Sequence, residues 1–446
     1  MRLQRLSSLC VLIGFFLFCS TAGWSQASPF PAPDVKQIYD RLLPQIEAIK
    51  AFDHHAHPGF ADDSDVDAMA SPPGSAAFRE RDTNPELIAA AKALWGYPYD
   101  DLSPEHAKWL VQKKAEMKKQ HSGTAYFDML LDKLNIERSV ANRAMMADYL
   151  DAKRFPWVFF VDSFMWPFDN SKETARNPDQ QVYIPLQEKM FHRWMQQASL
   201  NQLPPDFDGY LKFISSILEQ NKAKGGIAMK FEVAYFRPTR FGDPSKAEAQ
   251  AIYDKYVKGG VPSESEYRTF QDYIFRQLVR EGGRLHLPVH IHSAVGIGDY
   301  FNLSEGNVMN LENILRDPRY SGVTFVLIHG GYPYERQAIW LGAVKNVYLE
   351  SSLMEIAMYP SAFKDSLRQW LETFPDKITF GTDSFPYNDV LGAEESYWLG
   401  NKSARTGLAA ALAEMVSMHE ISEKRALELA HAYLHDTATQ IYQGVH

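Results

Sequence analysis

The sequence predicts an α/β protein, a (β/α)8 TIM barrel with long helical insertions after its first and third strands. Short, continuous apolar runs alternate with helical segments along the chain, and such runs are typical of strands buried on both faces. Several of these runs end in a histidine or an aspartate followed by turn residues. Because sites in such barrels are built at the carboxyl ends of the strands, this polarity favours a barrel enzyme.

The expected strands share this apolar character and follow an amphipathic helix over 35–49. They cover residues 51–57, 137–146, 157–162, 226–231, 287–293, 323–329, 346–350 and 377–383. A helix over 264–282 leads to the fifth strand, and helices after residue 404 close the molecule. We find no repeat and no second domain, so residues 28–446 are expected to form one barrel domain.

Two excursions are too long to be simple connections. The first covers about 59–122 and has helical character at Pro85–Trp95 and Pro104–Gln120. The second covers about 163–205 and includes a helix near 186–198. Connections of this length are usually functional. Since the first excursion leaves the carboxyl end of strand one, we expect it to cover the mouth of the barrel.

Residues 1–27 are expected to be a signal peptide. Arg2 and Arg5 precede an apolar run over 9–18, and Ser25-Gln26-Ala27 offers a small-x-small cleavage site. The apolar run is short for an uncleaved membrane anchor, and Phe18 stands where a lipoprotein signal on Cys19 requires a small residue. The expected location is therefore outside the cytoplasm, periplasmic or secreted.

Cysteine content and charge narrow the classes of chemistry and partner. Cys10 and Cys19 both lie in the leader, so the mature chain has no disulfide, cysteine ligand or cysteine nucleophile. The whole chain carries −9 and the leader +2, which leaves −11 for the mature protein. Without a basic block, nucleic acid and membrane surfaces are not expected partners of the mature chain. We expect a small-molecule substrate, and the sequence is compatible with a homo-oligomer.

The segment Asp53-His54-His55-Ala56-His57 indicates a metal site. Residues i and i+2 of a strand share a face, so His55 and His57 can present two imidazoles to one point, and imidazole nitrogens suit Zn, Fe, Ni or Mn. Three later strands end in further candidates, which are His292, His329 and Asp383. The sequence thus predicts a divalent metal at the rim of the barrel.

These motifs resemble the amidohydrolase superfamily, and more narrowly its amidohydrolase 2 branch of metal-dependent hydrolases and decarboxylases. The stretches 229–237 and 329–336 are similar to the nodulin-like amidohydrolases. The resemblance covers the chain from about Phe52 to the final helix.

The expected ligands are His55, His57, His292 and Asp383, with one Zn²⁺ as the expected ion. A divalent cation lowers the pKa of a bound water towards ~7. Asp383 could bind the metal through one oxygen and take a proton with the other. The resemblance implies that His329 either binds a second metal or donates a hydrogen bond to the developing oxyanion of the substrate. For a site with a single metal we favour the second role.

Lys230, at the end of the fourth strand, leaves three alternatives open. In some superfamily members a lysine at this place is carboxylated and bridges two metals. Lys230 could instead form an ion pair with Glu232. It could also bind a substrate carboxylate together with Arg237. Aromatic residues that follow strand ends are expected to line part of the pocket, among them Tyr235, Tyr332 and Trp166. His54, His290 and Asp53 are expected to be structural or to support the ligands.

The predicted function is a metal-dependent hydrolase that uses a metal-activated water on an amide, ester or lactone bond of a small molecule. The alternative is a metal-dependent decarboxylase of a small carboxylic acid, in which Arg237, Arg336 or Lys230 would hold the departing carboxylate. Export favours hydrolysis, because degradative hydrolases are common outside the cytoplasm.

Overall fold

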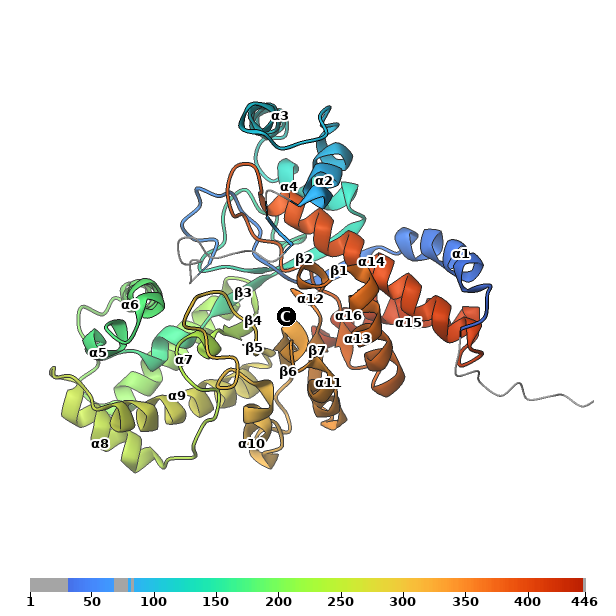
Figure 1. Cartoon of the computed structure of the whole chain (residues 1–446). Helices are drawn as coiled ribbons and strands as arrows, with labels where there is room; N and C mark the ends of the chain where they lie inside the picture. The colour runs from blue at the N-terminus through green and yellow to red at the C-terminus, as the bar shows by residue number, and fades with distance from the viewer. Residues whose placement is uncertain (1–30, 68–78, 82–83, 444–446) are drawn as a thin grey trace, which may run out of the picture.

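The fold is a single parallel barrel surrounded by helices (Figure 1). The computed structural model describes residues 31–67, 79–81 and 84–443, so the predicted leader lies outside the described residues. Each strand pairs in parallel with the next one along the chain. The strands are β1 (Ala51–Ala56), β2 (Ile136–Asn142), β3 (Trp157–Phe160), β4 (Gly226–Phe231), β5 (Val289–His292), β6 (Phe325–Ile328), β7 (Val347–Glu350) and β8 (Ile378–Thr379).

Backbone hydrogen bonds close the sheet between its first and last strands. The N–H of His54 donates to Phe380 O over 2.9 Å, the N–H of Asp383 donates to His55 O over 2.8 Å, and the N–H of His57 donates to Ser384 O over 2.7 Å. These bonds place the chain that follows β8 beside β1. The predicted (β/α)8 TIM barrel is therefore confirmed.

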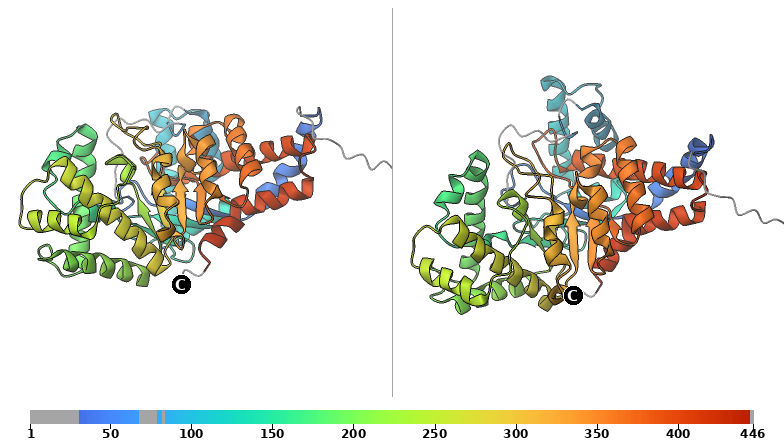
Figure 2. Two further views of the ribbon diagram at one scale, coloured as in Figure 1. Left: turned by 90° about the horizontal axis from the view of Figure 1, so that it is seen from below. Right: turned by 60° about the horizontal axis from the view of Figure 1, so that its bottom comes forward.

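Helices surround the barrel, as Figure 2 shows from two further sides. The α-helices are α1 (Val35–Ala48), α2 (Pro85–Trp95), α3 (Pro104–Gln120), α4 (Ala125–Lys133), α5 (Ser171–Thr174), α6 (Pro178–Gln197), α7 (Phe207–Ala223), α8 (Lys246–Tyr256), α9 (Glu264–Leu285), α10 (Glu312–Leu315), α11 (Glu335–Ala338), α12 (Met354–Ala357), α13 (Pro360–Thr373), α14 (Ala393–Ser417), α15 (Glu423–His431) and α16 (Thr437–Ile441). Short 3-10 or π segments are η1 (Asp162–Met165), η2 (Val233–Tyr235), η3 (Val308–Leu311), η4 (Pro318–Tyr320), η5 (His329–Gly331), η6 (Ile339–Ala343) and η7 (Ala432–Asp436).

The first excursion packs against α14 through a buried charge cluster. Lys114 of α3 lies 2.9 Å from Glu395 and 3.5 Å from Glu394, and all three side chains are buried. Trp95 donates to Glu395 over 2.8 Å, and Tyr126 donates to Glu394 over 2.5 Å. Each charge is paired and hydrogen-bonded, which a buried ion pair requires. The predicted helices α2 and α3 are both present with the expected bounds.

The second excursion carries α5 and α6 and is tied to the loop after β5. Tyr183 of α6 donates to Ile297 O over 2.7 Å, and the N–H of Tyr300 donates to Asp179 over 2.8 Å. Helix α6 begins eight residues before the expected start of 186, at Pro178, where the Asn177 side chain caps its first turn.

The amino end of the barrel is plugged by the last described helix. Tyr442, which follows α16, packs against a cluster of buried apolar side chains that includes Phe52 and Val140. Its hydroxyl lies 3.0 Å from His54 Nε2 and 3.1 Å from His290 Nε2. His54 and His290 thus have the structural surroundings expected of them. None of the described helices combines the length and the apolar character needed to cross a membrane.

Candidate metal centre

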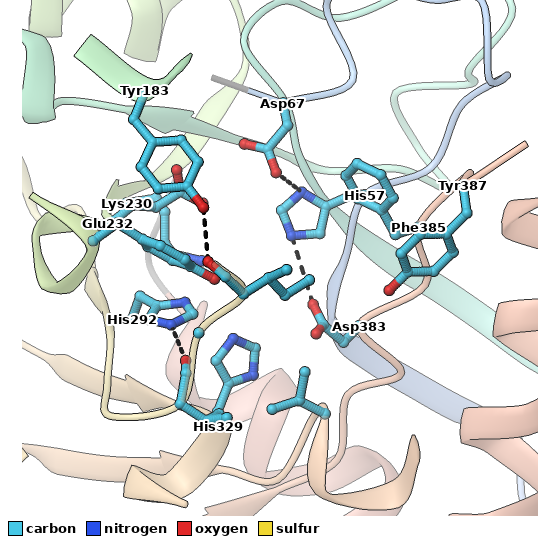
Figure 3. A pocket seen from close by; sticks show the side chains of 15 residues that line it. His57, Asp67, Tyr183, Lys230, Glu232, His292, His329, Asp383, Phe385 and Tyr387 are labelled. Atoms are coloured by element: carbon cyan, nitrogen blue, oxygen red, sulfur yellow. Dashed lines mark hydrogen bonds and ion pairs between the residues drawn. The ribbon is translucent and has the colours of Figure 1, made fainter. Parts of the chain in front are cut away.

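A cavity of about 630 Å³, its open mouth included, lies at the carboxyl ends of the strands (Figure 3). Strand ends, the loops that follow them and both excursions contribute to its wall. The lining residues are His57, Asp67, Tyr183, Lys230, Glu232, Tyr235, His292, Val295, Gly296, Ile297, His329, Leu353, Asp383, Phe385 and Tyr387. The cavity therefore lies where the strand polarity predicts the site.

His55 and His57 meet Asp383 at this end of the barrel. Asp383 Oδ1 lies 3.2 Å from His55 Nε2 and 3.6 Å from His57 Nε2. The pairing of β1 with β2 shifts register between Asp53 and Ala56, so the strand is irregular where the histidines leave it. His55 is fully buried beneath the cavity, and His57 lies at its wall.

His329 completes a group of potential metal ligands. Ligand atoms of His55, His329 and Asp383 all lie within 4.8 Å of one another. His329 and Asp383 have φ values of 64° and 51°, a left-handed conformation that is uncommon for residues other than glycine. Such strained backbone clusters at functional sites, where the surrounding structure holds it in place.

Burial sets the ionisation of these groups in the metal-free protein. It lowers the pKa of His55 and of His329 well below the usual value, with nearby Lys230 adding to the effect for both. It raises the pKa of Asp383 well above the usual value, against the opposing effect of Lys230. Neutral imidazoles are the form that binds metals, so the histidines are ready to act as ligands.

The residues of this group fit a divalent cation. Both ring nitrogens of His55 are buried without a hydrogen-bond partner, although Asp383 lies nearby. Unsatisfied buried polar atoms are costly, and a cation between the imidazoles and the carboxylate would satisfy Nε2, which is the nitrogen nearest to Asp383. Two or three histidines and one carboxylate suit zinc and other first-row divalent metals.

His292 lies beside the group but is held by another contact. Its ring centroid is 4.6 Å from that of His329, and its Nε2 is hydrogen-bonded to the carbonyl of Val295. Burial lowers the pKa of His292 to about 3, with a further effect from Lys230. A carbonyl only accepts, so Nε2 of the neutral ring carries the proton and Nδ1 the lone pair.

Lys230 lies in the cavity wall and has no hydrogen-bond partner among residues 31–67, 79–81 and 84–443. The side chain is fully buried and its Nζ makes no hydrogen bond, and one oxygen of Glu232 is also unpaired. The ion pair between Lys230 and Glu232 that the sequence left open is not formed in the described structure. Burial raises the pKa of Glu232 well above its usual value. Lys230 is the one cationic side chain among the described residues that line the cavity.

Tyr235 lines the cavity as expected, but three other proposed substrate-binding residues lie elsewhere. Arg237 is held by Asp272 over 2.6 Å and stacks on Phe241, with its charge centre 4.6 Å from the ring centroid. Trp166 is buried among aromatic rings. Tyr332 packs beside Val295 and Leu353 outside the described lining.

Other lining residues were not foreseen from the sequence. Asp67 in the first excursion lies 3.1 Å from His57 Nδ1, and Tyr183 comes from the second. Tyr387 lines the wall after β8, together with Phe385. Asp67 and Tyr183 carry no periodic signal, because they lie on excursions whose path depends on long-range packing, and Tyr387 lies in an irregular loop between β8 and α14. The only sequence signal of Asp67 and Tyr183 is the length of the excursions themselves.

The chain matches a known family over its second half. Residues 236–443 match the model of the amidohydrolase family, which confirms the resemblance that the motifs indicate. Over 160 residues the chain is 29% identical to protein fluG of Emericella nidulans. The aligned part is 35% of this chain and only 17% of that much longer protein.

Solved structures of similar fold cover nearly the whole chain. A protein described as a metal-dependent hydrolase from Lactobacillus casei has a TM-score of 0.59 at 16% identity and covers 90% of this chain and 97% of its own. The uronate isomerase of Thermotoga maritima has a TM-score of 0.58 at 12% identity, with coverages of 91% and 97%. The glucuronate isomerase of Caulobacter crescentus has a TM-score of 0.56 at 14% identity, with coverages of 93% and 95%. At these identities the likeness shows the fold and does not select a reaction.

Proposed function

We propose that this chain, whose residues 236–443 match the model of the amidohydrolase family, is a metal-dependent hydrolase that acts on an amide, ester or lactone bond of a small molecule. One observation carries the proposal. His55, His329 and Asp383 come from three different strand ends, yet their ligand atoms lie within 4.8 Å of one another, beside His57. These donors would hold the cation, with Zn²⁺ as the proposed ion.

A divalent cation bound there supplies a Lewis acid and an activated water. The chain's own contribution begins with Asp383, the one carboxylate in the described ligand group. One of its oxygens faces the imidazoles of His55 and His57, which leaves the other free to take the proton of the attacking water. The buried setting excludes bulk water and strengthens these interactions.

The cavity wall limits the size and the character of the substrate. Its aromatic and apolar side chains, Tyr183, Tyr235, Phe385, Tyr387 and Leu353, would enclose a small organic molecule. Lys230 would face an anionic or carbonyl oxygen of that molecule, because its Nζ has three donors and no hydrogen-bond partner among the described residues.

A carboxylated Lys230 bound to two cations stays an alternative to this role. The proposed count is one cation, and two if Lys230 is carboxylated. We further propose export to the periplasm or the medium after removal of residues 1–27, and a single domain over 28–446.

The second candidate is a metal-dependent decarboxylase, which the unpaired Lys230 also favours. A departing carboxylate needs cations to hold it, and Lys230 is the only one among the described lining residues. Arg237 is committed to Asp272 and is not available for that role. Since Arg237 cannot help Lys230 to hold a departing carboxylate, hydrolysis is favoured over decarboxylation.

A substrate screen before and after metal removal tests the proposal. Amides, esters and lactones would be compared with aromatic and aliphatic carboxylic acids, with product release followed for the former and CO₂ release for the latter. We expect hydrolysis that is lost after dialysis against a chelator and restored by Zn²⁺ or another divalent ion. Full activity of the metal-free protein would refute the mechanism, and CO₂ release without hydrolysis would establish the decarboxylase.

A further inference from the structure

Within the part of the chain that the structure describes, the imidazole of His329 is hydrogen-bonded on one side only. Its Nδ1 lies 3.0 Å from the carbonyl oxygen of Ser352 and 3.0 Å from the Ser352 hydroxyl oxygen. A carbonyl oxygen cannot donate, so Nδ1 must carry the proton that this contact uses. The neutral imidazole is the form that binds a metal. A neutral ring with a proton on Nδ1 has a lone pair on Nε2.

Glu350 of β7 fixes the direction of the hydroxyl contact. The Ser352 hydroxyl donates to Glu350 Oε2 over 2.6 Å, and the backbone N–H of Ser352 donates to Glu350 Oε1. The backbone N–H of His329 also points to Glu350 Oε2, over 3.4 Å. Since the hydroxyl gives its single proton to Glu350, its oxygen faces His329 as an acceptor.

The barrel is shaped around the Glu350 carboxylate. Glu350 and Ser352 are both fully buried, and a Cβ atom on Gly381 would overlap Glu350 Oε1. Gly381 stands two residues before Asp383 in the Gly381-Thr382-Asp383 segment. Burying a carboxylate is costly unless hydrogen bonds replace its contacts with water. The three donors that point to Glu350 supply these hydrogen bonds, so the surrounding structure is adapted to hold this side chain.

We propose that Glu350 and Ser352 are positioning residues that keep the His329 proton on Nδ1, so that the Nε2 lone pair faces the ligand atoms of His55 and Asp383. The inference rests on the proposed function and deepens it, because it makes His329 an acceptor towards the cation. A neutral His329 in this form cannot donate a hydrogen bond from Nε2 to a substrate oxyanion, which was the role favoured from the sequence. His292 has the opposite arrangement, since its Nε2 is committed to the carbonyl of Val295.

Nitrogen NMR of the full-length, metal-free protein reads the proton position directly. Only the histidines would carry ¹⁵N, and His329→Gln would identify the signals of His329 among the 14 histidines of the chain. The spectra would be recorded at several pH values, so that the neutral form of His329 is included. We expect a protonated Nδ1 and an unprotonated Nε2 for His329. A proton on Nε2 would overturn the proposal.

Two variants test the consequence for metal affinity. Glu350→Gln replaces one acceptor oxygen with a donor, which turns the Ser352 proton towards His329 Nδ1 and should weaken metal binding about 10- to 100-fold. Ser351→Ala is the matched control, because Ser351 is equally buried but its hydroxyl contacts Glu355 and Tyr433 instead. It should change the affinity by less than about threefold, in keeping with a group outside the ligand shell.

Affinity would be measured by competition with a chromophoric chelator, and far-ultraviolet circular dichroism would check the fold. In Glu350→Gln, the NMR spectrum should also show the His329 proton moved from Nδ1. Unchanged affinity and an unchanged proton position in that variant would refute the proposal, as would an equal loss in Ser351→Ala. If the wild-type protein binds no divalent ion at all, the proposed function fails, while the proton position of His329 is still decided by NMR.

Discussion

Asp383 is the residue on which the proposed chemistry most depends, because it is both a ligand and the base. Asp383→Asn keeps the shape of the side chain and one coordinating oxygen but removes most of its basicity. We expect turnover to fall by about 10²- to 10⁴-fold, the usual contribution of a positioned base, while most of the metal stays bound. Steady-state kinetics and metal content of the same preparation would be compared.

Asp63→Asn supplies a control for this variant. Asp63 is a partly buried aspartate paired with Arg143 over 2.6 Å, and it does not line the cavity. Its replacement should leave turnover nearly unchanged. If Asp383→Asn kept the wild-type rate, Asp383 would not be the base.

Single residues show where sequence reasoning succeeds and where it stops. His55, His57 and Asp383 could be assigned to one site because strand ends meet at one rim of a parallel barrel. The different surroundings of His292 and His329 could not be predicted, because they depend on contacts with Val295 and Ser352 in loops distant in sequence. Arg237 follows β4 as expected, but Asp272 of helix α9 binds its guanidinium and holds it away from the cavity.

At the level of elements, the first excursion reaches the barrel through Glu80. This residue is buried and hydrogen-bonded to Ser396 of α14, and Tyr387 of the cavity wall contributes a further hydrogen bond. Burial raises the pKa of Glu80 to about 7, against the lowering effect of these two bonds. The folded protein therefore holds a proton on Glu80 more tightly than the unfolded chain does.

This raised pKa makes a prediction about stability. The contribution of Glu80 is fully present below the ordinary glutamate pKa of 4.5 and is lost as the pH rises through about 7. The free energy of unfolding should thus fall by about 3 kcal/mol across this range on account of Glu80. Glu80→Gln should remove this part of the slope, as measured by urea unfolding in the presence of a chelator.

Glu105→Gln in α3 is the control for this measurement, because Glu105 is exposed. It should preserve the slope of the wild-type protein. A Glu80→Gln variant with the wild-type slope would show that folding does not raise the pKa of Glu80.

The element boundaries follow from local signals in some places and from tertiary contacts in others. Helices α2 and α3 could be predicted to the residue because each begins with a capping-type residue followed by proline. The eighth strand was expected to reach Asp383, but β8 ends at Thr379. The chain beyond it instead bonds to β1 to close the barrel, and such closure is invisible in local sequence.

For the whole molecule, eight apolar runs in sequence were enough to predict the barrel, because parallel strands joined by helices have few other closed arrangements. The path of the two excursions was not predictable, since the buried cluster of Lys114, Glu394 and Glu395 joins segments about 280 residues apart. The identity of the substrate depends on these same excursions, which is why the sequence specifies the class of site better than its substrate.

Metal analysis of the purified full-length protein by inductively coupled plasma mass spectrometry tests the central claim most directly. Because donors from β1 and from the segments that follow β6 and β8 converge within 4.8 Å, we predict about one equivalent of a divalent ion, or two if Lys230 is carboxylated. His55→Ala should remove most of the bound metal. A fully active protein without a stoichiometric divalent ion would contradict the account.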